Sequence, residues 1–196
     1  VVGRIEEGAA PFMDPIMQVL GAALGGAYHA EPSLAIVAVL DIGEAAQALR
    51  GAFAPHADTA MQLLLAVLSS AAAPRAVKPK AVAAVGDVAL AIGPAFQRFV
   101  APCCQVLLQA AGVAAAGVDD ADWEAVDAAV ELRQALLDAF TCIVQAVADD
   151  AAATAAFLPA CPAILQFTEH IVSAGDSECP AEILKSAVGL VGDIAA

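Results

Sequence analysis

Residues 77–96 read VKPKAVAAVGDVALAIGPAF, and this segment decides the fold because the chain repeats it. Altered copies begin at Leu34, Leu132 and Ile183, so the first lies 43 residues before Val77 and the second 55 residues after it. A small residue followed by an acidic one marks three of the copies, at Gly43-Glu44, Gly86-Asp87 and Gly192-Asp193. The sequence therefore predicts a chain of about four repeated units.

The length of the repeat indicates the fold class. A period of about 40–47 residues with two helices per unit is typical of HEAT and armadillo solenoids. Within residues 77–92, apolar side chains recur at steps of three and four, which predicts one helical stripe. We expect residues 1–196 to form an all-α, right-handed α-α superhelix of about four helix pairs. The expected helices are residues 11–24, 33–49, 56–69, 77–92, 94–111, 122–148, 154–173 and 180–196.

The composition agrees with helices and limits the partners. Apolar residues make up 61% of the chain, many of them Ala, which loses little entropy in a helix. The 22 acidic and 8 basic residues give a net charge of −14, which argues against nucleic acid and favours basic partners. The mean hydropathy of +0.77 raises the alternative of a membrane span. The longest uncharged run, 99–118, contains Pro102 and Gly112 and few Leu, Ile or Phe residues, so we expect no membrane insertion.

The chain carries no motif for catalysis. We find no serine nucleophile elbow, phosphate-binding glycine loop or zinc signature, and we expect no enzyme activity, cofactor or metal. The five cysteines show no Cys-x-x-Cys spacing, and we expect them to be reduced and mostly buried: they are Cys103, Cys104, Cys142, Cys161 and Cys179. His29, His56 and His170 are too far apart for a metal motif.

An acidic face is expected on the helix at 122–148. The side opposite its apolar residues carries Asp127, Glu131, Gln134, Asp138 and Gln145, and neighbouring helices offer Glu44, Asp87 and Asp193. One interpretation is a track of carboxylates that binds a basic helix through charge-assisted contacts. The other is a face that is simply solvated. For Asp87 and Asp193, a hydrogen bond between repeats is an equally good alternative.

Three further residues allow two interpretations each. Trp123 begins the same helix and is either a partner-binding anchor or a residue that packs its loop against the body. Lys78 and Arg133 lie where HEAT repeats tend to place a cation, and we expect them to link one repeat to the next rather than bind a partner.

Four segments in a fixed order carry a resemblance to a known family. They are residues 77–96, DWEAVDAAVELRQALLDAFTCIVQAV at 122–147, ILQFTEHI at 164–171 and SAVGLVGDIA at 186–195. Together they resemble the C-terminal half of importin-β type nuclear transport receptors. The resemblance covers most of residues 50–196 and is weaker over 1–49, where VLDIGEAAQAL at 39–49 departs from the family pattern.

The resemblance implies a function. Receptors of this family bind basic cargo, or the basic helix of the adaptor importin-α, on an acidic concave face, and Ran-GTP releases it. Nucleoporin FG repeats bind the outer face, mostly in other repeats. The implied location is the cytoplasm, the nucleus and the nuclear pore. The expected partner-binding residues are Glu44, Asp87, Trp123, Asp127, Glu131 and Asp138.

Two other classes remain as alternatives. The first is another HEAT scaffold, such as a phosphatase regulatory subunit or an import receptor paralogue. The second is a helical enzyme or a membrane protein. The chain begins without Met and ends inside an expected helix without a polar cap, so we expect a fragment of a longer receptor.

Overall fold

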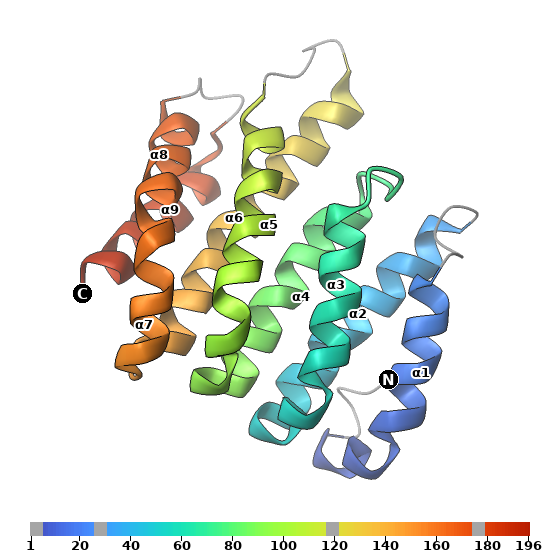
Figure 1. Cartoon of the computed structure of the whole chain (residues 1–196). Coiled ribbons are helices and arrows are strands. Elements are labelled where there is room, and N and C mark those ends of the chain that lie inside the picture. Colours follow the sequence, from blue (N-terminus) through green and yellow to red (C-terminus); the bar gives the residue numbers. More distant parts are fainter. Residues whose placement is uncertain (1–5, 26–30, 117–121, 174–178) are drawn as a thin grey trace.

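A computed structural model describes residues 6–25, 31–116, 122–173 and 179–196, and helices dominate these ranges (Figure 1). The α-helices are α1 Met13–Leu24, α2 Pro32–Leu49, α3 Ala57–Ser69, α4 Val77–Ile92, α5 Gln97–Ala115, α6 Trp123–Val147, α7 Ala151–Phe157, α8 Cys161–Val172 and α9 Ala181–Ala195. Short 3-10 helices occupy Glu6–Phe12, Arg50–His56, Gly93–Phe96 and Leu158–Ala160.

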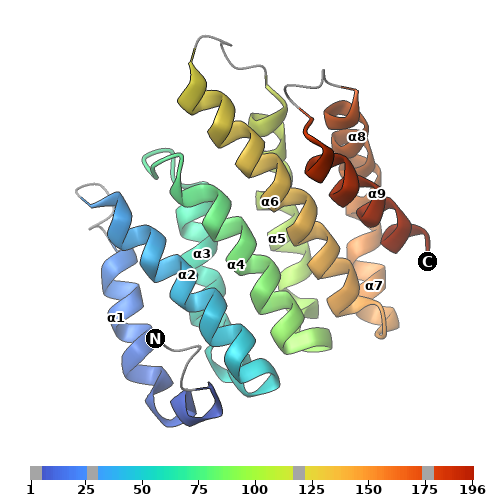
Figure 2. The ribbon, with the colours of Figure 1, turned by 180° about the vertical axis from the view of Figure 1, so that it is seen from behind.

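The helices form two layers that run the length of the molecule. The first-helix layer contains α1, α3, α5 and the α7–α8 unit, which face the viewer in Figure 1. The second-helix layer contains α2, α4, α6 and α9, which face the viewer in Figure 2. Most contacts between successive pairs are made by α2 with α4, α4 with α6 and α6 with α9. The expected all-α superhelix of four helix pairs is confirmed.

One expected helix is divided in two. The sequence predicted a single helix at 154–173, but α7 ends at Phe157 and α8 begins at Cys161. Pro159 and Pro162 lie at this break, and proline has no N–H to donate to the preceding turn. The other expected helices lie within a few residues of the observed ones, although α5 continues four residues beyond 111, to Ala115.

The second helix of each of the first two pairs ends in the same way. Arg50 has φ 50° and ψ −130°, and Gly93, 43 residues later, has φ 53° and ψ −129°. This region suits glycine, and a side chain there is strained. At both places the chain passes through a 3-10 helix and runs back as the first helix of the next pair (Figure 1).

Three helical stretches are long and apolar enough to cross a membrane by length and composition alone. They are Pro32–Ser69, Val77–Ala115 and Ala151–Val172. The first two are not single rods, because the chain reverses at Arg50 and at Gly93 (Figures 1 and 2). The absence of membrane insertion stays a prediction.

Small residues let the second helices approach closely. A Cβ atom on Gly43 would lie 3.5 Å from the Cα atom of Ala84 in the next pair. One on Gly86 would lie 3.3 Å from the Cα atom of Ala139 and 3.2 Å from the Cβ atom of Cys142. The Gly86 distances are tighter than most Cβ contacts, so a larger residue there would push against α6. At Gly43 the Ala84 distance is ordinary van der Waals contact, and the nearest atom to a Cβ would be an Asp87 carboxylate oxygen, at 2.5 Å. The two glycines thus permit the close spacing of the stack.

This packing can be tested with two matched glycine substitutions. Gly86→Ala should lower the free energy of unfolding by about 1–3 kcal/mol, because the backbone of α6 must move to admit the methyl group. Gly189→Ala should raise it by about 0.5–1 kcal/mol, because alanine favours helix and a Cβ atom there meets nothing within 4 Å. Urea unfolding followed by circular dichroism measures both. Equal stability of the two variants would contradict the close contact.

Candidate partner-binding face

Four of the expected residues lie along one face of α6. Trp123, Asp127, Glu131 and Asp138 are spaced by four, four and seven residues, which places them on the same side of a helix. All four are exposed, and Trp123 is 76% exposed. The opposite side of α6 packs into the core, where its largest buried side chains are Leu136, Leu137, Phe140 and Ile143. We call the exposed row the α6 stripe.

The start of this row is fixed by a capping interaction. The Asp122 carboxylate accepts a hydrogen bond of 3.0 Å from the backbone N–H of Ala125. Such a cap stabilises the first turn of a helix by about 1 kcal/mol. Within the described residues, Trp123 and Asp127 make no side-chain hydrogen bond or ion pair, so both are available to a partner.

A groove of about 390 Å³ lies beside the stripe, between α4, α6 and α9. Its charged side chains are Lys80, Glu131, Asp138 and Glu182, so carboxylates outnumber the single cation. The Lys80 ammonium lies 3.7 Å from a Glu131 oxygen, and both side chains are substantially exposed. We call this the acidic groove, because it retains two uncompensated carboxylates.

The Asp138 carboxylate is held in place from its own helix. Gln134 Nε2 lies 3.0 and 2.9 Å from the two Asp138 oxygens, and 2.6 Å from Ser186 Oγ on α9. These contacts join α6 to α9 beneath the groove. Asp138 keeps free acceptor capacity, because a carboxylate offers about four lone-pair sites.

Asp87 and Asp193 make the hydrogen bonds between repeats that the sequence allowed as one of two alternatives. Gln47 Nε2 on α2 donates to Asp87 Oδ1 on α4 at 2.6 Å, and Gln145 Nε2 on α6 donates to Asp193 Oδ2 on α9 at 2.8 Å. Burial raises the pKa of Asp87, while the hydrogen bond from Gln47 lowers it. Both aspartates therefore accept a hydrogen bond from a glutamine of the preceding repeat.

The structure does not bring all six expected residues together. Glu44 is exposed on α2, and α4 separates α2 from α6 (Figure 2). Asp87 is half-buried, and its carboxylate accepts the hydrogen bond from Gln47. Lys80 and Glu182 line the groove beside the stripe, but they were not among the expected residues. Alignment of the repeats identifies equivalent positions, and it does not show which residues of different helices lie close together.

The first-helix layer carries polar contacts and a groove of its own. Arg98 Nη2 lies 3.0 Å from Asp58 Oδ2, and His56 Nδ1 lies 3.4 Å from Asp14 Oδ1. A groove of about 360 Å³ lies between α5 and α8, and we call it the first-layer groove. It is lined by Leu108, Ala111, Gly112, Ala115, Ala163, Gln166, Phe167 and His170.

Buried cations and thiols serve packing. Arg133 is 2% exposed, and its Nε donates to the Ala114 carbonyl at 2.9 Å, a bond within the third helix pair. All five thiols are free: Cys103 and Cys104 are buried, and the other three are partly buried. Burial raises the pKa of Cys104 to about 12, so its thiol stays protonated at neutral pH. The described residues contain no cluster of His, Cys, Asp or Glu suited to a metal ion, and His29 lies outside them.

Comparisons with known proteins point to one family. The family described as "Importin subunit beta-1-like, TPR repeats" matches residues 1–196. Importin subunit beta-1 of Arabidopsis thaliana is 34% identical over 167 residues, which cover 84% of this chain and 18% of that protein. The protein of the same name from Schizosaccharomyces pombe is 30% identical over 195 residues, which cover 100% of this chain and 22% of that protein. The chain thus spans about a fifth of the length of these relatives.

Comparison with solved structures points to the same family. A structure of Kap95p that concerns the switch loops of RanGDP matches with a TM-score of 0.86 and 25% identity, over 98% of this chain and 21% of that one. A crystal structure of importin beta has the same TM-score and 27% identity, over 99% of this chain and 22% of that one. A Kap95:Nup1 complex matches with a TM-score of 0.83 and 25% identity, over 98% and 21% of the two chains.

The Asp87 carboxyl gives a pH-dependent prediction. Because its pKa is raised in the folded state, the folded chain binds this proton more strongly than the unfolded chain does. The contribution of Asp87 to the free energy of unfolding therefore falls as the pH rises from about 4 through the raised pKa. Asp87→Asn keeps an acceptor for Gln47 and removes the ionisation. We expect its stability, relative to the original chain, to increase between pH 4 and pH 7 in urea unfolding.

A matched variant separates this effect from general charge. Asp149→Asn also removes one carboxylate, at an exposed turn. The Asp87→Asn difference should change more with pH than the Asp149→Asn difference. A constant Asp87→Asn difference across this range would show that the carboxyl is not perturbed by burial.

Proposed function

Because this chain belongs to the importin subunit beta-1-like family, we propose that it forms part of a nuclear import receptor and binds basic protein segments on its second-helix layer. The supporting observation is the acidic groove, in which Glu131, Asp138 and Glu182 face a single Lys80. Family membership favours this function over that of a phosphatase regulatory subunit. The proposed role is binding and release without catalysis, in the cytoplasm, in the nucleus and at the nuclear pore.

The α6 stripe has the dimensions of a short helix. Asp138 lies 15 residues after Trp123, which is about 22 Å along the helix at 1.5 Å per residue. A basic helix laid along it would meet carboxylates at Asp127, Glu131 and Asp138. The Trp123 ring would offer a face for an arginine, since a guanidinium over an indole is attracted by about 0.5–1 kcal/mol at an exposed site.

The size of these contacts limits what the chain does alone. Exposed ion pairs contribute about 0.2–1 kcal/mol each, whereas a nanomolar complex requires about 12 kcal/mol. The three carboxylates of the stripe therefore give weak binding by themselves. We propose that a whole receptor gains affinity by wrapping its partner over many repeats.

The proposed partners are the basic helix of importin-α or other basic cargo, with release by Ran-GTP. Support for Ran comes from the similarity to Kap95p, whose solved structure concerns RanGDP. Net charge adds support, because a chain with a net charge of −14 attracts basic segments and repels acidic ones.

A peptide titration tests the proposed face. A peptide corresponding to the importin-α basic helix should bind the chain, and replacing its Lys and Arg residues by Gln should abolish binding. The triple variant Asp127→Asn, Glu131→Gln, Asp138→Asn should raise the dissociation constant about tenfold, since each lost contact removes a fraction of a kcal/mol. Fluorescence anisotropy at 50 and 300 mM salt measures both effects, and binding should weaken at the higher salt.

A matched triple variant controls for net charge. Asp14→Asn, Asp58→Asn, Asp149→Asn removes the same charge from exposed positions outside the groove. It should change the dissociation constant by less than about threefold. Binding that is independent of salt, or equally weakened by both triple variants, would count against the α6 stripe.

We further propose that the first-layer groove binds nucleoporin FG repeats. A related structure is a Kap95:Nup1 complex, and here the groove between α5 and α8 is lined by apolar side chains that include Leu108 and Phe167. A phenylalanine side chain entering it would remove apolar surface from water on both partners. His170 also lines the groove, and its Nε2 lies 3.1 Å from the Ala115 carbonyl oxygen.

Gly112 allows this groove to be filled without disturbing the core. A Cβ atom there meets nothing within 4 Å, so Gly112→Leu should fold and obstruct the groove. It should weaken binding of an FG-repeat peptide by about fivefold or more, since one apolar contact is worth about 1 kcal/mol. Gly112→Ala, which adds only a methyl group, is the matched control and should bind nearly as the original does. Unchanged binding by Gly112→Leu would place the FG site elsewhere.

A further inference from the structure

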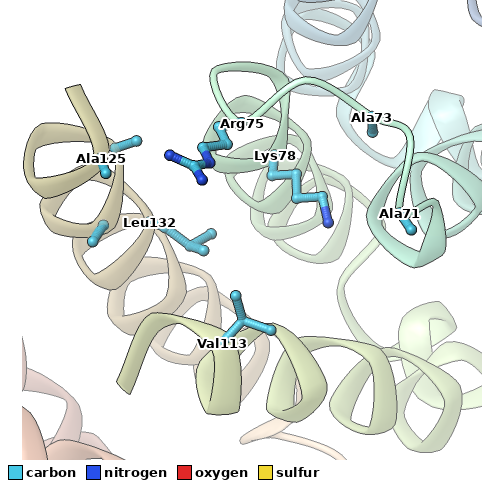
Figure 3. A pocket seen from close by; sticks show the side chains of 9 residues that line it. Ala71, Ala73, Arg75, Lys78, Val113, Ala125 and Leu132 are labelled. Atoms are coloured by element: carbon cyan, nitrogen blue, oxygen red, sulfur yellow. The ribbon is translucent and has the colours of Figure 1, made fainter. Parts of the chain in front are cut away.

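We propose that a separate cationic pocket binds an acidic, aliphatic segment of a partner protein, with a leucine-like side chain on the pocket floor and a carboxylate at Arg75 and Lys78. The pocket has a volume of about 290 Å³. It lies where the turn before α4, the end of α5 and the first turns of α6 meet (Figure 3). No part of the proposal depends on the binding of basic cargo.

The floor of the pocket is apolar and partly exposed. Leu132 and Val113 project into the space from α6 and α5, and Ala73 lies across from them (Figure 3). Val113 is 69% exposed, so the described residues leave most of it uncovered. The α6 residues of the floor recur at steps of three and four, at Ala125, Ala128, Ala129 and Leu132. An aliphatic side chain placed here would cover apolar surface that is otherwise in water.

Two cations line the same space. The half-buried Lys78 was expected to link one repeat to the next, but within the ranges that the structure describes its ammonium makes no hydrogen bond or ion pair. Arg75 Nη1 lies 3.8 Å from Asp122 Oδ2, with the two side chains 74% and 54% exposed. That pair is too long for a strong hydrogen bond, so the guanidinium remains available to a carboxylate of a partner.

The charge of the whole chain makes this pocket unusual. A net charge of −14 repels an acidic peptide at long range. Attraction must therefore come from the local cations, and a basic segment would meet Arg75 and Lys78 as like charges. The pocket and the α6 stripe lie on opposite sides of the same first turns of α6, because Ala125 and Leu132 face away from Trp123 and Asp127. The two sites thus select partner segments of opposite charge.

The test is a nuclear magnetic resonance titration of the 196-residue chain, labelled with nitrogen-15. The probe is the peptide GELDELDG, and its neutral counterpart is GQLNQLNG. We expect the acidic peptide to shift the amide signals of Val113, Ala125 and Leu132 with a dissociation constant of about 0.1–1 mM. The double variant Arg75→Gln, Lys78→Gln should raise that constant by about fivefold or more.

Three controls decide between the possible results. Lys185→Gln removes an exposed cation outside the pocket and should change the constant by less than about twofold. Ala129→Phe should fill the floor and weaken binding while both cations remain, with circular dichroism confirming the fold. The double variant should still bind the basic importin-α peptide. Equal binding of GQLNQLNG, shifts confined to other residues, or an equal loss with Lys185→Gln would each overturn the proposal.

Discussion

The close approach of the second helices determines the rest of the structure. At Gly43 and Gly86 a side chain would meet the backbone of the next helix at about 3.3–3.5 Å. In interiors packed at this density, a change in side-chain volume of even one methylene affects stability. The spacing between α2, α4 and α6 is therefore fixed, and with it the positions from which Gln47 reaches Asp87 and Lys80 reaches Glu131. The acidic groove exists because this stack holds its walls apart at a set distance.

A hydrogen bond from glutamine to aspartate complements this packing at two of the three junctions. Gln47 with Asp87 and Gln145 with Asp193 repeat the same bond between successive second helices. At the middle junction, between α4 and α6, Leu90 replaces the glutamine and Cys142 replaces the aspartate. The two helices therefore pack at these positions without the glutamine–aspartate hydrogen bond. Burial also raises the pKa of Cys142 to about 11, consistent with an unreactive thiol that fills space between helices.

Much of the fold could be predicted from the sequence, because the repeat and the helical stripe are local signals. The helix at 77–92 matches α4 in full, and Gly93 marks its end. The break in the last first-layer helix was missed, although Pro159 and Pro162 lie inside the expected helix at 154–173, and interior prolines are the sequence signal for such a break. The site was harder to predict. Helical spacing placed Trp123 and Asp127 on one face, but only the packed structure shows that Glu182 faces Asp138 and that Lys78 lies in a pocket.

Helices pack more closely within the second-helix layer than within the first-helix layer, and this difference has a mechanical consequence. The second-helix layer is closely packed at its glycines, whereas the first-helix layer is joined by exposed pairs such as Arg98 with Asp58 and contains an open groove. If such an array changes curvature, we expect the closely packed second-helix layer to keep its length. The seams between α1, α3, α5 and α8 would then widen or narrow instead.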